Sequence, residues 1–211
     1  MAVGEMRLVA LIRSNILQVS TLILTVSFLI WTVSPGWGAV HQEKILKQRD
    51  YHSDDPLKIV DISAANKQIR LDERFTAGDD WLNGMRLQFK NISNKDINYI
   101  EIQFNLPETR SSGNEMSFRS ELGNMPALPV RNKPLLLKPN EDVTYNLNQD
   151  EYQSLLGFVR NRHRISDIND VELKIGFVVF ADLTAWSGGI LLKQSSSNPR
   201  RWIPTDSQSK K

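Results

Sequence analysis

Strict alternation of apolar and polar residues is the feature of this sequence that most constrains its fold. It runs through LNGMRLQFKNIS (82–93) and returns in INYIEIQFNL (97–106). Successive side chains of a β-strand point to opposite faces, so this period predicts two half-buried strands. The turn between them is rich in Asn and Ser, which predicts that the two strands form an antiparallel hairpin.

Further strands are predicted at 57–63, 66–75, 143–147, 171–182, 187–193 and 200–204. One helix is predicted over 148–162, because acidic residues occupy its first turn and arginines its last, as the helix dipole favours. The pattern predicts a mainly β protein. Its domain, residues 57–204, is expected to be an immunoglobulin-like or fibronectin type III-like antiparallel β-sandwich with one helix.

Residues 1–39 have the composition of a targeting segment. Arg7 and Arg13 precede an apolar run from Ile16 to Val33, and no Asp, Glu, Lys or Arg occurs from Ser14 to Gln42. This layout predicts an N-terminal hydrophobic helix that is either a cleaved signal peptide or an uncleaved signal anchor, which would cross a membrane through residues 14–33. Both alternatives predict an exported domain that is periplasmic, on the cell surface or secreted. In the second case it is anchored in the inner membrane.

Three other segments lack a sustained period. Residues 40–56 are charged and are predicted to be a polar linker, and residues 205–211 a disordered tail. Residues 107–134 carry four of the nine prolines and are predicted to be a long irregular loop. Long loops on compact domains are often functional, so this loop is a candidate contact surface.

The composition excludes several chemistries. Cysteine is absent, which excludes disulfides, thiol nucleophiles and cysteine-based metal sites. The net charge is only +2, so we expect no nucleic-acid partner. His163 is the one histidine outside the predicted linker, and no nucleophile-elbow, phosphate-loop or calcium-loop motif occurs. We therefore predict no catalytic, cofactor-binding or metal-binding residues, and a protein that is not an enzyme.

The candidate contact residues are aromatic or charged. Trp81 and Trp186 each lie near a predicted turn, where an indole either fills the end of the core or stacks on a sugar ring. Asp182 belongs to the turn before Trp186. Arg160 and Arg162 end the predicted helix and either complement its dipole or bind an anionic group.

The C-terminal segment carries a resemblance. IGFVVFADLTAWSGG, followed by PRRWIP, resembles the end of a group of uncharacterised exported bacterial proteins with a D-x-T-x-W-x-G … R-W-x-P pattern. The matching residues are Asp182, Thr184, Trp186, Gly188, Gly189, Arg201, Trp202 and Pro204. Leu183 stands where that pattern has a turn glycine, which predicts a different turn geometry. The resemblance implies a β-sandwich of the immunoglobulin or fibronectin type III kind and brings no function with it.

Two functions remain open from the sequence. The first is a non-enzymatic module that binds a protein partner of the cell envelope, with the 107–134 loop and the tryptophan-bearing turns as its contact surface. The alternative is a carbohydrate-binding module that uses exposed tryptophans, Trp186 and Trp81, against an envelope polysaccharide. The sequence does not set the oligomeric state.

Overall fold

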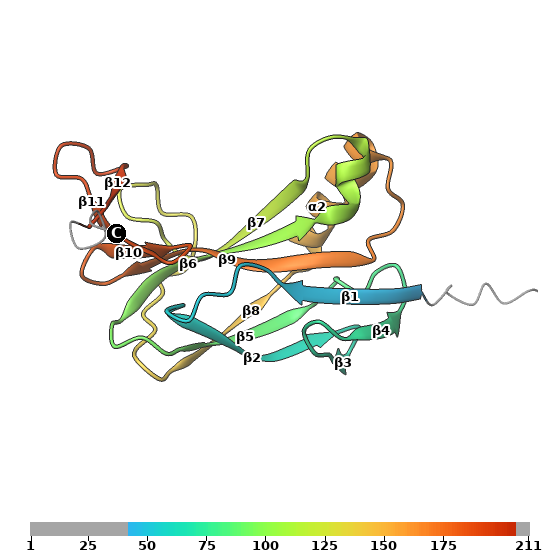
Figure 1. Cartoon of the computed structure of the whole chain (residues 1–211), viewed down its shortest axis with the longest axis horizontal. Helices are drawn as coiled ribbons and strands as arrows, with labels where there is room; N and C mark the ends of the chain where they lie inside the picture. Colours follow the sequence, from blue (N-terminus) through green and yellow to red (C-terminus); the bar gives the residue numbers. More distant parts are fainter. Residues whose placement is uncertain (1–41, 206–211) are drawn as a thin grey trace, which may run out of the picture. The chain divides into compact units, whose positions relative to one another are not determined.

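The computed structural model describes residues 42–205 (Figure 1). The predicted signal segment 1–39 and most of the predicted tail, residues 206–211, lie outside this range. Within it, no helix has the length and apolar character needed to cross a membrane.

Two β-sheets and one α-helix make up the described part of the chain, which confirms the predicted mainly β fold. The larger sheet contains β1 (Gln42–Gln48), β4 (Arg74–Ala77), β6 (Ile97–Leu106), β7 (Met116–Gly123), β9 (Asp170–Phe180), β10 (Thr184–Ser187), β11 (Ile190–Gln194) and β12 (Trp202–Pro204). The smaller sheet has the strand order β3 (Lys67–Gln68), β2 (Leu57–Ala64), β5 (Arg86–Asn91), β8 (Asp142–Asn146). The α-helix is α2 (Gln149–His163), and a 3₁₀ helix, η1 (Pro107–Ser112), joins β6 to β7.

Strand β9 organises the larger sheet. One side of it pairs along most of its length with β6, and β7 follows β6 at the margin. The other side pairs with β1 near its start and with β10 near its end. The β1–β9 pair is parallel, whereas every other strand pair described is antiparallel. The sheet is therefore mixed at this pair, while the predicted antiparallel arrangement holds for the other described pairs.

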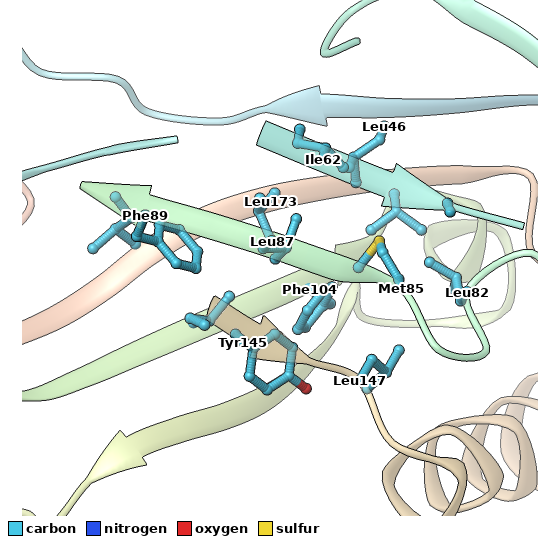
Figure 2. Close-up of a cluster of buried hydrophobic side chains, with 14 of the residues drawn as sticks. Leu46, Ile62, Leu82, Met85, Leu87, Phe89, Phe104, Tyr145, Leu147 and Leu173 are labelled. Atoms are coloured by element: carbon cyan, nitrogen blue, oxygen red, sulfur yellow. The ribbon is translucent and has the colours of Figure 1, made fainter. Parts of the chain in front are cut away.

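The core lies between the two sheets (Figure 2). Leu87 and Phe89 of β5 point from the smaller sheet toward Phe104 and Leu173 of the larger one, and all four are buried. Their polar neighbours in sequence face outward, as the period-two pattern predicts. Burial of such side chains stabilises the fold by about 1.5–3 kcal/mol each, before the loss of conformational entropy is counted.

The predicted hairpin of 82–93 with 97–106 does not form. β5 pairs with β2 and β8, whereas β6 pairs with β7 and β9 in the other sheet. Asn91 holds the crossing between the sheets. Its Nδ2 donates to the carbonyl oxygens of Lys95 (2.8 Å) and Leu137 (2.9 Å), and its Oδ1 accepts from the Ser93 amide (3.0 Å). The turn was predicted correctly, but alternation says nothing about which strands become neighbours.

Two segments predicted to lack structure contain strands. Residues 42–48 of the predicted linker form β1, where Lys44 and Leu46 are fully buried. The domain therefore includes residues on the N-terminal side of 57. Within the predicted loop 107–134, η1 and β7 are regular, and the irregular parts are residues 113–115 and the stretch after Gly123. The alternation is concealed in both strands because a polar residue occupies an inward position. This residue is Lys44 in β1 and Ser120 in β7.

Candidate functional site

Helix α2 begins with a capping box that its sequence specifies. The Asn148 side chain accepts a hydrogen bond from the Glu151 amide (3.0 Å), and the Glu151 carboxylate accepts one from the Asn148 amide (3.4 Å). Arg164 ends the helix in the left-handed conformation, with φ of 56°. The buried face consists of Tyr152, Leu155, Leu156 and Val159. This face fixes the helix on the fold and leaves the neighbouring side chains toward solvent.

A polar contact joins β7, β8 and α2. The Tyr145 hydroxyl donates to Ser120 Oγ at 2.7 Å, and Ser120 Oγ donates to Glu151 Oε1 at 3.3 Å, while the Tyr145 hydroxyl oxygen also lies 3.1 Å from Glu151 Oε2. Burial raises the pKa of the Tyr145 phenol, so the group stays neutral. Because β7 and β8 belong to different sheets, this Tyr145–Ser120–Glu151 contact fixes the helix against the strand at the margin of the larger sheet.

A groove of about 720 Å³ lies between this strand and the helix. Its apolar wall consists of Met116 and Phe118 of β7 and Phe158 of α2. Phe158 is 42% exposed although it sits one position from the buried face of the helix. An aromatic ring left in this position contributes little to the core. The groove therefore offers apolar surface that a partner could cover.

The strand beside the groove has an unpaired edge. β7 pairs with β6 on one side, and no other described strand pairs with it (Figure 1). Every second residue of an edge strand directs its backbone N–H and C=O groups away from the sheet. The groove thus combines apolar side chains with a row of backbone hydrogen-bonding groups.

The charges at the groove are mainly positive. Arg162 lies over the Phe158 ring, with its guanidinium carbon 5.0 Å from the ring centroid, and Arg119 is largely exposed. Glu115 also lines the groove, but Arg49 (2.7 Å) and Arg110 (2.8 Å) already bind its carboxylate. His163 Nδ1 is 2.7 Å from Ser112 Oγ, a contact that joins α2 to η1. An anionic group on a ligand would therefore meet two arginines.

The predicted contact residues do not lie together. Arg162 lines the groove, whereas Arg160 is exposed and outside its lining. Trp81 is fully buried, donates from Nε1 to the Ile168 carbonyl oxygen at 2.7 Å, and packs edge-on against Phe75. Trp186 is only 4% exposed. Both indoles belong to the core, which confirms the first of the two alternatives that the sequence left open, and neither exposes a ring face on which a sugar could stack.

Asp182 lies in the turn between β9 and β10, as predicted. Desolvation opposes its charge, but hydrogen bonds from Lys95 and Thr184 outweigh that effect and hold the pKa of Asp182 below its usual value. Leu183, next to it, adopts φ of 60°. This is a left-handed conformation that favours glycine, and the difference in turn geometry from the resembled pattern stays a prediction.

Among residues 42–205, no three acidic or histidine side chains lie close enough together to hold a metal ion. Comparison with known proteins found no matching family model, no matching curated protein and no matching solved structure.

Sequence reasoning missed Phe118, Phe158 and the edge of β7. A signal for β7 was present, because Met116, Phe118 and Leu122 alternate with polar residues. The proline-rich surroundings and the inward Ser120 concealed it. No sequence signal distinguishes Phe158 from the adjacent core positions of the helix.

Proposed function

We propose that this protein is an exported, non-enzymatic module that binds a protein partner of the cell envelope in the groove between β7 and α2. The observation that carries the proposal is the coincidence of three features in one place. These are an unpaired strand edge, a half-exposed Phe158 and the positive charges of Arg119 and Arg162.

The mode of binding would be strand addition. An extended segment of the partner pairs with the free edge of β7 through backbone hydrogen bonds, and its alternate side chains enter the groove. Apolar side chains at those positions cover Phe118 and Phe158, while acidic side chains reach the arginines at the rim. The partner segment is therefore extended, apolar at every second position and acidic in between.

Export rests on residues 1–39, whose basic start and uncharged apolar run have the layout of a signal peptide or signal anchor. Fractionation of cells and N-terminal sequencing of the native protein test this part. Recovery of the protein in the cytoplasm with an intact N-terminus would overturn it. The immunoglobulin-like or fibronectin-like assignment is likewise proposed. Two packed sheets joined by a crossing such as that of β5 to β6 support it.

The binding proposal is tested by selecting ligands for the full-length chain from a displayed library of unstructured peptides. Phe158→Asp places a charge at the apolar wall and is expected to abolish recovery of the selected peptides. Ile190→Asp is the matched control, because Ile190 is 45% exposed on β11, outside the groove. Selected peptides without the apolar–acidic alternation, or equal loss in both variants, would refute the proposal.

A further inference from the structure

A second cavity lies at the other end of β6 from the groove. Its volume is about 450 Å³, within the range of about 300–1,000 Å³ that is usual for small-molecule pockets. Three connections form it: residues 53–56 before β2, residues 92–95 between the sheets, and Trp186 with Leu191 from the β10–β11 hairpin. Loops from distant parts of the sequence thus converge on one pocket.

Two of the residues that line this pocket each have a buried side-chain atom without a hydrogen-bond partner within residues 42–205. These atoms are the indole Nε1 of Trp186 and the Oδ1 of Asp55, and both residues are more than nine-tenths buried. The second carboxylate oxygen of Asp55 accepts from the His52 amide at 3.2 Å. A buried polar group left without a partner destabilises the fold, and most such groups in proteins are satisfied by a protein atom, a water or a ligand.

The two groups have complementary requirements. The indole N–H needs an acceptor, and the carboxylate oxygen needs a donor. A hydroxyl group can act as both, so a ligand that carries hydroxyl groups matches the needs of both atoms. The apolar residues Ile92, Phe180 and Leu191 also line the pocket, and they suit the C–H face of a ring.

Lys95, which lines the pocket, holds one of its connections in place. Lys95 bonds to Asp182 at 2.7 Å and to Thr184 Oγ1 at 2.9 Å, which ties the 92–95 connection to the β9–β10 turn.

We propose that this pocket binds a neutral polyhydroxylated ring, of the size of one sugar residue. A ligand hydroxyl accepts from Trp186 Nε1 and donates to Asp55 Oδ1, while the apolar face of the ring lies against Phe180 and Leu191. Trp186 acts here through its N–H edge from within the core and not through an exposed ring face. This site is independent of the groove between β7 and α2.

The test uses the indole ¹H–¹⁵N signals of the full-length chain in a titration with glucose, galactose and N-acetylglucosamine. The Trp186 signal is assigned from the Trp186→Phe variant. We expect at least one sugar to shift this signal in a saturable manner while the Trp81 signal stays in place. In Asp55→Asn, which keeps the shape of the side chain but removes its charge, we expect affinity to fall about ten-fold or more.

Asp142→Asn is the matched control, because Asp142 is an exposed residue of β8 outside the pocket lining. It is expected to leave the affinity unchanged. An unaltered Trp81 signal shows that each variant is folded. The proposal is overturned if none of the sugars shifts the Trp186 signal, if all indole signals shift together, or if Asp55→Asn binds as tightly as the original chain.

Discussion

The substitution Tyr145→Phe tests the contact that fixes α2 against β7. Tyr145 is buried, and its hydroxyl bonds to Ser120 Oγ at 2.7 Å and to Glu151 Oε2 at 3.1 Å. Phenylalanine keeps the ring but removes both bonds. The buried Ser120 Oγ then retains only its 3.3 Å contact with Glu151. A partner group left under-satisfied in this way costs about 1–3 kcal/mol of unfolding free energy.

Urea denaturation of the full-length chain, followed by tryptophan fluorescence, measures this loss as a lower midpoint with an unchanged slope. Tyr51→Phe is the matched control, because Tyr51 is 63% exposed. We expect the control to change the unfolding free energy by less than about 0.5 kcal/mol. Equal midpoints for the two variants would refute the role assigned to this contact.

The same substitution has a predicted pH dependence. Burial raises the pKa of Tyr145 in the folded state above its value in the unfolded chain, which is about 10. The contribution of the neutral phenol is therefore complete below about pH 10. It falls as the pH rises further, by about 1.4 kcal/mol per pH unit for each such tyrosine. Burial also raises the pKa of Tyr99, so Tyr145→Phe should lose stability less steeply above pH 10 than the original chain, without becoming independent of pH.

Three further predictions concern stability. Asp167→Asn removes the counter-charge of the fully buried Lys44 and should lower the unfolding free energy, measured by urea denaturation, by about 3–5 kcal/mol. A loss below about 1 kcal/mol would contradict the role of this buried ion pair. Burial raises the pKa of Asp55, so its charge destabilises the fold as the pH rises through that pKa. Asp55→Asn should then be more stable than the original chain at pH 7 and should lose that advantage near pH 3, and a variant less stable at pH 7 would contradict this. Leu183→Asn should raise the unfolding free energy by up to about 1 kcal/mol, because asparagine tolerates a φ of 60° better; no gain would show that the turn is unstrained.

Much of the fold could be predicted from the sequence because burial leaves a period in it. The core positions of β5 and β6 and the capped helix α2 follow directly from apolar spacing and end signals. Which strands pair with one another does not follow from this spacing, because packing between residues far apart in the sequence decides the pairing. The predicted hairpin failed for this reason. β1 was missed because an inward lysine, Lys44, is stabilised by Asp167 and Asn169, which are distant in sequence.

The candidate site was predictable only in part. The helix end with Arg162 and the segment 107–134 were singled out from the sequence as candidate contact surfaces, and residues of both line the groove. The tryptophans were not predictable in orientation, because a residue near a turn can face the core or solvent. Trp81 faces the core, where the Ile168 carbonyl oxygen satisfies its N–H. The free edge of β7 follows from the topology of the whole sheet, which no local pattern contains.

Amide hydrogen exchange of β7, measured with and without a selected peptide, tests the central claim most directly. Strand addition predicts that alternate backbone amides between Met116 and Gly123 exchange more slowly in the complex, since the added strand bonds to every second residue. The protection should be absent in Phe158→Asp and present in Ile190→Asp. A peptide that binds without slowing exchange anywhere in β7 would contradict the account.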